Sequence, residues 1–185
     1  MIWFTGDLHV GHFNILKYCK RPFNTVQEMD ECLISNWNEV VKRGDVVYVL
    51  GDFAYWKLSD DEIKNIYDNL TGQKFLIRGN HDRRVGNYWL DVKDTHWLKK
   101  ERIFLSHYSH RVWRNSCHSS KNLFGHSHGQ LEERFNQLDV GIDNCDYYPI
   151  NVDDAMFRIE EINGRVELSE EIQKMEKDER TCKNS

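Results

Sequence analysis

Residues 46–52 read Val-Val-Tyr-Val-Leu-Gly-Asp, a continuous apolar run that ends in a glycine and a carboxylate. Such a run, bounded by turn residues, predicts a strand that is covered on both faces. Shorter apolar runs at 2–5, 75–77, 103–105 and 123–124 also end just before polar motifs. Because open sheets present functional groups at the carboxyl ends of their strands, the pattern predicts an α/β fold with these polar side chains gathered together.

Two helices are predicted, one between the strands at 2–5 and 46–50 and one between the strands at 46–50 and 75–77. Thr25 with Glu28, and Ser59 with Glu62, have the spacing of capping boxes. The apolar residues after Thr25 follow a helical period, and the second helix is expected to end near Gly72.

The last third of the chain is expected to add strands and then a tail. Apolar stretches at 138–142, 156–159 and 165–168 are interpreted as strands of a second, more antiparallel sheet. We expect one domain over residues 1–168, because no low-complexity linker interrupts the chain. The charged segment 169–185 is expected to form a solvated helix and a frayed tail.

The composition narrows the class of protein. A formal charge of −5 over 185 residues gives no broad basic surface, which argues against tight, sequence-independent binding to nucleic acid. The five cysteines are odd in number and form no CxxC pair, so a reducing, cytoplasmic location is expected. No apolar run approaches roughly 18 residues, so no membrane span is expected. The sequence leaves the oligomeric state open.

The polar motifs after the strands contain metal-ligand residue types without thiolates. The candidate ligands are Asp7, His9, Asp52, Asn80, His107, His126 and His128. Carboxylate, amide and imidazole ligands suit two divalent first-row metal ions better than a structural zinc site. We expect Mn²⁺ first, with Fe, Zn, Ni or Co as alternatives.

Two such ions would hold phosphoryl oxygens and activate a water molecule as the nucleophile. Asp52 is able to bridge both ions, since a carboxylate has two oxygens with several lone pairs. His81 is the candidate general acid on the leaving oxygen, and Asp82 is the candidate residue that orients it.

The candidate substrate-binding residues lie within or beside these motifs. His12 and Asn14 follow the first ligand pair, while Arg21 and Arg78 could each hold a non-reacting phosphate through a bidentate contact. The short chain leaves no room for a large cap, so the substrate is expected to be a small phosphorylated molecule of nucleotide type or a terminal phosphate of nucleic acid.

Taken together, Asp7-x-His9, Gly51-Asp52, Gly79-Asn80-His81, His107 and Gly125-His126-x-His128 resemble the motifs of the calcineurin-like metallophosphoesterase superfamily, in the same order. The segment 11–23, with its Arg21-Pro22-Phe23 end, and the stretch 140–143 are similar to a compact bacterial and phage branch.

The resemblance implies a four-layer α/β/β/α sandwich around two mixed sheets. It also implies the ligand sets: Asp7, His9, Asp52 and His128 for one ion, and Asp52, Asn80, His107 and His126 for the other. The implied activity is hydrolysis of a phosphodiester or phosphomonoester. The alternatives are a phosphoprotein phosphatase, a factor acting on nucleic acid ends, and a non-catalytic binding module on the same fold.

Overall fold

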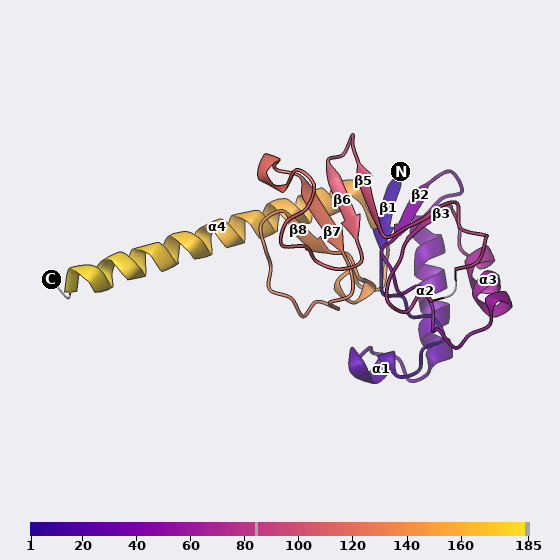
Figure 1. Ribbon diagram of the computed structural model, residues 1–185. Coiled ribbons are helices and arrows are strands. Elements are labelled where there is room, and N and C mark those ends of the chain that lie inside the picture. Colours follow the sequence, from indigo (N-terminus) through magenta and orange to yellow (C-terminus); the bar gives the residue numbers. More distant parts are fainter. Residues whose placement is uncertain (84, 184–185) are drawn as a thin grey trace.

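Five strands form the first sheet, in the spatial order β4-β3-β2-β1-β9, and Figure 1 labels β1, β2 and β3 of this sheet. Their bounds are Ile2–Thr5 (β1), Val46–Val49 (β2), Gln73–Ile77 (β3), Val92–Lys93 (β4) and Ile150–Asn151 (β9). Strands β1 to β4 are parallel, whereas β9 pairs with β1 in the antiparallel direction. The computed structural model of the chain describes residues 1–83 and 85–183, with side chains to residue 174.

Four strands form the second sheet, in the order β5-β6-β7-β8. They are Thr95–Leu98 (β5), Ile103–Ser106 (β6), Lys121–Phe124 (β7) and Gln137–Asp139 (β8). Here β5 is antiparallel to β6, and β6, β7 and β8 are parallel. Both sheets are therefore mixed, as expected.

Helices enclose the two sheets. The α-helices are Ile15–Tyr18 (α1), Val26–Val40 (α2), Asp60–Asn69 (α3) and Val152–Lys183 (α4), and the short 3₁₀ helices are Ser116–His118 (η1) and Ile142–Asn144 (η2). Figure 1 shows α3 and α2, the first sheet, the second sheet and α4 following one another from right to left. The expected α/β sandwich is confirmed.

Alternating side chains of β2 separate two hydrophobic cores. Val47 and Val49 pack in the core that also holds Trp37 of α2, whereas Tyr48, and Leu50 just after β2, pack in the core that holds Leu105 of the second sheet. A strand whose two faces are both covered has no polar face, which explains the uninterrupted apolar run 46–50.

The predicted helix starts are confirmed. The Thr25 side chain accepts a hydrogen bond from the Glu28 backbone N–H at the start of α2. Ser59 and Glu62 form a complete capping box at the start of α3. Strands were also expected at 138–142, but β8 ends at Asp139 and the chain turns into η2.

The strands predicted at 156–159 and 165–168 are wrong, since both stretches lie within α4. Ala155, Ile159 and Ile162 are buried in the second core, at helical spacing. Asn151 and Asp154 form two hydrogen bonds with each other at the start of the helix, as in a helix cap. The short apolar runs that follow gave no sign of a helix, because such runs also fit strands. The helix projects beyond the sheets (Figure 1). The end of the tail expected to fray, at 184–185, lies outside the described residues.

No helix in the described part of the chain combines the length and the apolar character that crossing a membrane requires. Strands β1, β2 and β3 are parallel in the first sheet, and β6 and β7 are parallel in the second. The polar motifs begin at the carboxyl ends of these strands, so the parallel arrangement positions the functional site.

Candidate functional site

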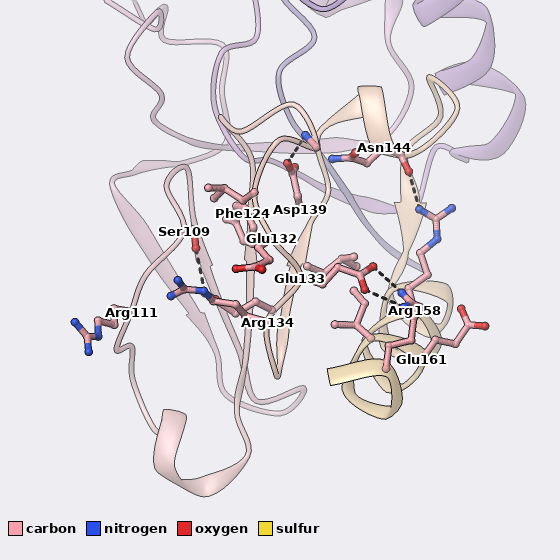
Figure 2. Close-up of a pocket in the computed structure, with 16 residues that line it drawn as sticks. Ser109, Arg111, Phe124, Glu132, Glu133, Arg134, Asp139, Asn144, Arg158 and Glu161 are labelled. Carbon is pink, nitrogen blue, oxygen red and sulfur yellow. Dashed lines mark hydrogen bonds and ion pairs between the residues drawn. The ribbon is translucent and has the colours of Figure 1, made fainter. Parts of the chain in front are cut away.

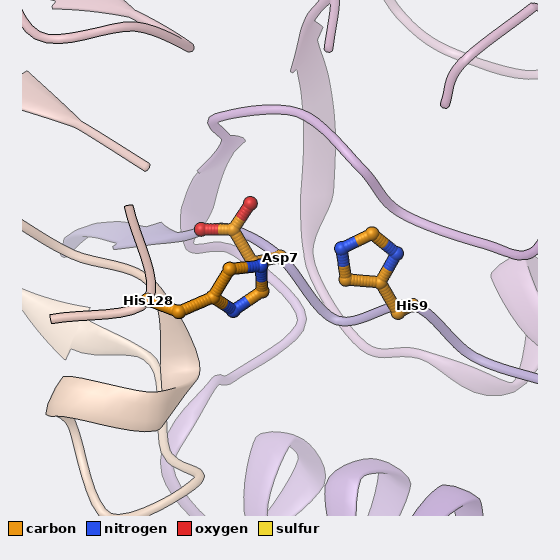
Figure 3. A group of neighbouring side chains, drawn as sticks. All are labelled: Asp7, His9 and His128. Carbon is orange, nitrogen blue, oxygen red and sulfur yellow. The ribbon is translucent and has the colours of Figure 1, made fainter. Parts of the chain in front are cut away.

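The loops after β1 and β7 bring one group of candidate ligands together. Asp7, His9 and His128 offer ligand atoms that all lie within 4.8 Å of one another (Figure 3). The Asp7 side chain also accepts a hydrogen bond of 2.8 Å from the His126 backbone N–H, which ties the two loops across the sheets. We call these three residues cluster one.

A second group lies beside it. Asp52, His107 and His126 also offer ligand atoms within 4.8 Å of one another, and they form cluster two. Asn80 joins this group, because its Oδ1 atom lies 3.0 Å from His107 Nε2. All seven candidate ligands predicted from the sequence thus lie in or against one of the two clusters.

Asp52 lies between the clusters. Its Oδ2 atom is 3.5 Å from His9 Nε2 on one side and 3.6 Å from His107 Nε2 on the other. The other oxygen, Oδ1, accepts a hydrogen bond of 2.8 Å from the His81 backbone N–H. One carboxylate oxygen therefore faces ligand atoms from both groups.

The backbone is held in an unfavourable conformation at most of these residues. Positive φ angles between 47° and 67° occur at Asp7, His9, Asp52, His126 and His128. Each such residue costs about 1–3 kcal/mol, and such strain gathers where function requires it.

Glycines let the ligand loops approach closely. A Cβ atom on Gly51 would lie 2.2 Å from His107 Nδ1, and one on Gly79 would lie 2.3 Å from Asp52 Oδ1. Neither distance is possible for a real Cβ atom, so the Gly-Asp and Gly-Asn-His motifs need glycine at these positions.

Several polar atoms in the clusters are buried without a partner. Among the described residues these include Asp7 Oδ1 and both ring nitrogens of His9. Burial raises the pKa of Asp7 well above its ordinary value and lowers the pKa of His9, an effect to which the Arg21 charge adds. A bound cation would satisfy a carboxylate oxygen and imidazole nitrogens that are buried together without hydrogen-bond partners. The residues therefore fit divalent metal ions.

In two of the candidate ligand histidines, the Nδ1 atom lies against a protein acceptor, which fixes the orientation of the ring. His107 Nδ1 lies 2.8 Å from the Leu50 carbonyl oxygen, so an Nδ1–H donor there leaves Nε2 free as a ligand. His128 Nδ1 lies 2.6 Å from Asp143 Oδ2. Burial would lower the pKa of His128, but hydrogen bonds with Asp143 and Cys19 raise it to about 10.

The contacts of Arg21 differ from the substrate-binding role expected for it. The side chain is buried, and its guanidinium donates to Asp143 at 2.8 and 2.9 Å, to the Leu8 and Asp7 carbonyl oxygens, and to Met29 sulfur. These contacts engage all five N–H groups. Arg21 therefore holds the Asp7 loop and Asp143, and has no donor left for a substrate.

Asp82 also differs from the expectation. Its carboxylate accepts hydrogen bonds from the backbone N–H groups of Asp52 (2.8 Å), Phe53 (3.0 Å) and Gly79 (2.8 Å). Both oxygens are occupied by backbone, so the geometry gives Asp82 no contact through which to orient His81. It fastens the loops after β2 and β3 to each other.

Of the remaining predicted residues, His81 and His12 lie next to cluster one, whereas Asn14 lies on the surface. The His81 ring meets the His9 ring edge-on, with centroids 5.0 Å apart. The buried His12 ring is 5.8 Å from the His81 ring and stacks on Tyr55 at 4.4 Å. Asn14, by contrast, is exposed at the start of α1, where its side chain makes no capping hydrogen bond.

Three residues near the site were not predicted. Asp139 accepts hydrogen bonds from Ser127 and from the Gly129 backbone, and so braces the loop that carries His126 and His128. Asp143 joins His128 to Arg21. Tyr108 packs its ring on His107 and His126 at 4.8 and 4.6 Å. Two sequence signals were available: Tyr108 is adjacent to a predicted ligand, and Asp143 lies in the stretch 140–143 that resembles the family.

A large cavity lies apart from the clusters. It has a volume of about 740 Å³ and is bounded by the 129–139 segment and by α4 (Figure 2). Figure 2 shows Arg158 and Glu161 of α4 on one side and Arg111 and Arg134 on the other. None of the candidate ligands lines it.

The comparisons with known proteins agree with this geometry. Residues 1–174 match the family described as calcineurin-like phosphoesterase. The chain is 45% identical over 82 residues to "Uncharacterized protein MJ1445" of Methanocaldococcus jannaschii, a match that covers 44% of this chain and 47% of that protein. It is 26% identical over 178 residues to the "Gene 66 protein" of Mycobacterium phage L5, covering 76% and 86% of the two chains.

A solved structure shares the fold. AQ665 of Aquifex aeolicus, described as a protein of unknown function, superposes with a TM-score of 0.62 at 24% identity, over 81% of this chain and 94% of that one. The family is one of metal-dependent phosphoesterases, which accords with clusters of carboxylate, amide and imidazole ligands. The chain belongs to the calcineurin-like phosphoesterase family.

Proposed function

We propose that the two clusters hold two divalent metal ions and that the protein hydrolyses a phosphodiester or phosphomonoester of nucleotide type. Asp7, His9, Asp52 and His128 would bind one ion, and Asp52, Asn80, His107 and His126 the other. The observation that carries this proposal is the position of Asp52 Oδ2, 3.5 Å from His9 Nε2 and 3.6 Å from His107 Nε2. Oxygen and nitrogen ligands favour Mn²⁺, Fe or Zn over softer metals.

Two such ions, when bound, would neutralise charge on the phosphoryl oxygens and activate water near neutral pH. The protein's part is to hold the ligands in place. His107 and His128 each direct one nitrogen to a protein acceptor, so their other nitrogens face the clusters.

His81 is the residue that we assign to the leaving group. Its backbone N–H donates to Asp52 Oδ1, which fixes the residue beside the bridge between the clusters. Its ring is half-buried and lies against the His9 ring, so it is within reach of a phosphate held there. A proton donated from its imidazole would stabilise the leaving oxygen. His12, on the same side, would contact the substrate or His81.

The proposed nucleotide type rests on the surroundings of the clusters. Tyr108 is half-exposed above His126, and Tyr55 is stacked on His12, so aromatic rings flank the site on two sides. Such rings can stack a base. A phosphoprotein phosphatase is less well supported because no observation on the described residues favours a peptide groove. A binding module is less well supported because a residue of a metal-ligating type stands at every expected ligand position.

The test is hydrolysis by metal-stripped protein with Mn²⁺ added back. A bis-aryl phosphodiester and an aryl phosphomonoester would be compared, with Asn80→Ala and His81→Ala alongside the exposed His118→Ala as a matched control. We expect the wild-type protein to show Mn²⁺-dependent turnover. Asn80→Ala and His81→Ala should each reduce this turnover by at least about 100-fold, which for His81 is a typical loss for a general acid. His118→Ala should retain it. No turnover from folded protein that binds two ions would favour the binding module.

A further inference from the structure

The loops after β2 and β3 carry exposed cations beside the clusters. Arg78 and Arg83 line an open groove of about 450 Å³ together with Asn80, the candidate ligand of cluster two. Lys57, from the loop after β2, does not line this groove but lies over the same Trp56 ring as Arg83. Asp82 also lines the groove, but its carboxylate is engaged by backbone N–H groups, and Asn80 joins the groove to cluster two.

An aromatic side chain holds two of these cations in place. The Arg83 guanidinium lies 5.3 Å from the centre of the Trp56 ring, and the Lys57 ammonium lies 5.2 Å from it. Trp56 in turn packs in the same small pocket as His81. Cation–π contacts of this kind orient a charged side chain without neutralising it.

The charges of these residues are weakly compensated. Arg78 is half-exposed, and its ion pair with Asp94 is long, at 3.7 Å. Such exposed pairs contribute little, so the guanidinium is free to exchange its partner. Among the described residues, Arg83 forms no ion pair within 4.0 Å. Arginine is suited to phosphate because its N–H groups match two phosphate oxygens.

From these observations, and on the basis of the proposed function, we infer that Arg78 and Arg83 bind a second phosphate of the substrate that is not itself cleaved. The preferred substrate would then be a phosphate ester of a nucleotide that carries a further phosphate near the scissile one. A nucleic acid strand and a free nucleoside bisphosphate both provide this chemistry.

Two chromogenic phosphodiesters would test the inference. Thymidine 5′-(p-nitrophenyl phosphate) and the same compound with a 3′-phosphate differ only in the second phosphate. We expect the wild-type protein to prefer the 3′-phosphorylated compound in kcat/KM. The double variant Arg78→Ala/Arg83→Ala is expected to reduce this preference about tenfold, mainly through KM, as loss of a charge-assisted contact would. Lys99→Ala/Lys100→Ala, at the opposite end of β6 from His107, is the matched control.

The possible results separate this inference from the proposed function. An equal loss of turnover on both compounds, or no preference in the wild type, would overturn the second-phosphate site while leaving the hydrolase intact. If neither compound is hydrolysed, equilibrium dialysis still tests the site by comparing the affinities of the protein for thymidine 3′,5′-bisphosphate and for thymidine 5′-monophosphate. Equal affinities would contradict the second-phosphate site. Oligothymidylates of increasing length distinguish the two sources: affinity that rises with length and falls steeply with salt indicates the strand.

Discussion

Asp143 Oδ2 lies 2.6 Å from His128 Nδ1, and the same carboxylate accepts two hydrogen bonds from Arg21. This chain of contacts fixes which nitrogen of His128 faces cluster one. A carboxylate behind a ligating histidine also raises the basicity of that ligand. Residues 122 positions apart in the sequence thus cooperate to hold one ligand.

Replacing Asp143 should therefore weaken metal binding. We expect Asp143→Ala to lower Mn²⁺ affinity about 10- to 100-fold, the usual cost of losing such a partner. Calorimetric titration of metal-stripped protein measures the change, with the exposed Glu160→Ala as the control for lost charge. Unchanged affinity in folded Asp143→Ala protein would remove Asp143 from the support of cluster one.

Asp82 gives a different prediction, because its partners are backbone groups. Asp82→Ala would leave two buried N–H groups and one part-buried N–H group without an acceptor, at a cost of about 3 kcal/mol in unfolding free energy. Urea unfolding of the metal-free protein measures this loss, and the exposed Asp94→Ala should show little change. Full stability combined with a shifted pH profile of kcat would instead support the role predicted from sequence, in which Asp82 orients His81.

The sequence predicts the candidate ligands better than it predicts what supports them. Asp7, Asp52 and Asn80 follow apolar strands directly, so their position at the strand ends can be predicted from local pattern. The partnerships of Asp143 with His128 and of Asp82 with the Asp52 loop join distant segments, and no local pattern records them.

The prediction of helix α4 failed for a different reason. Short apolar stretches such as 156–159 do not distinguish a strand from one buried face of a helix. The deciding features were the burial of Ala155, Ile159 and Ile162 at helical spacing, and the reciprocal cap between Asn151 and Asp154. The burial depends on where the second sheet lies.

Gly79 provides a test of the geometry between the clusters. In Gly79→Ala, the new Cβ atom would lie 2.3 Å from Asp52 Oδ1 and 2.6 Å from the Asp52 backbone nitrogen. Asp52 must then move, and since it faces both clusters, we expect the protein to lose metal at both. Metal content after gel filtration measures this. Gly44→Ala is the matched control, because its Cβ would meet nothing within 4 Å. Two retained ions in Gly79→Ala would contradict the assigned bridging position.

Asp45 predicts a pH dependence of stability that is independent of the metal site. Its carboxylate accepts hydrogen bonds from the Met1 amino group at 2.7 Å and from Trp3 Nε1 at 3.0 Å. The bond with the amino group is the main cause that lowers the pKa of Asp45 to about 2. A carboxyl with a depressed folded-state pKa contributes its full stability above the ordinary value near about 4, and loses it as pH falls through about 2.

Asp45→Asn should remove this contribution. The difference in unfolding free energy between wild type and Asp45→Asn is therefore expected to be largest above about pH 5 and to shrink as the pH falls toward about 2. Urea unfolding of both metal-free proteins at several pH values measures this difference. The contributions of the other titrating groups cancel, because both proteins contain them. A difference that stays constant from pH 5 downward would mean that the carboxylate charge contributes nothing, and that β1 is held to the start of β2 by neutral hydrogen bonds and strand pairing alone.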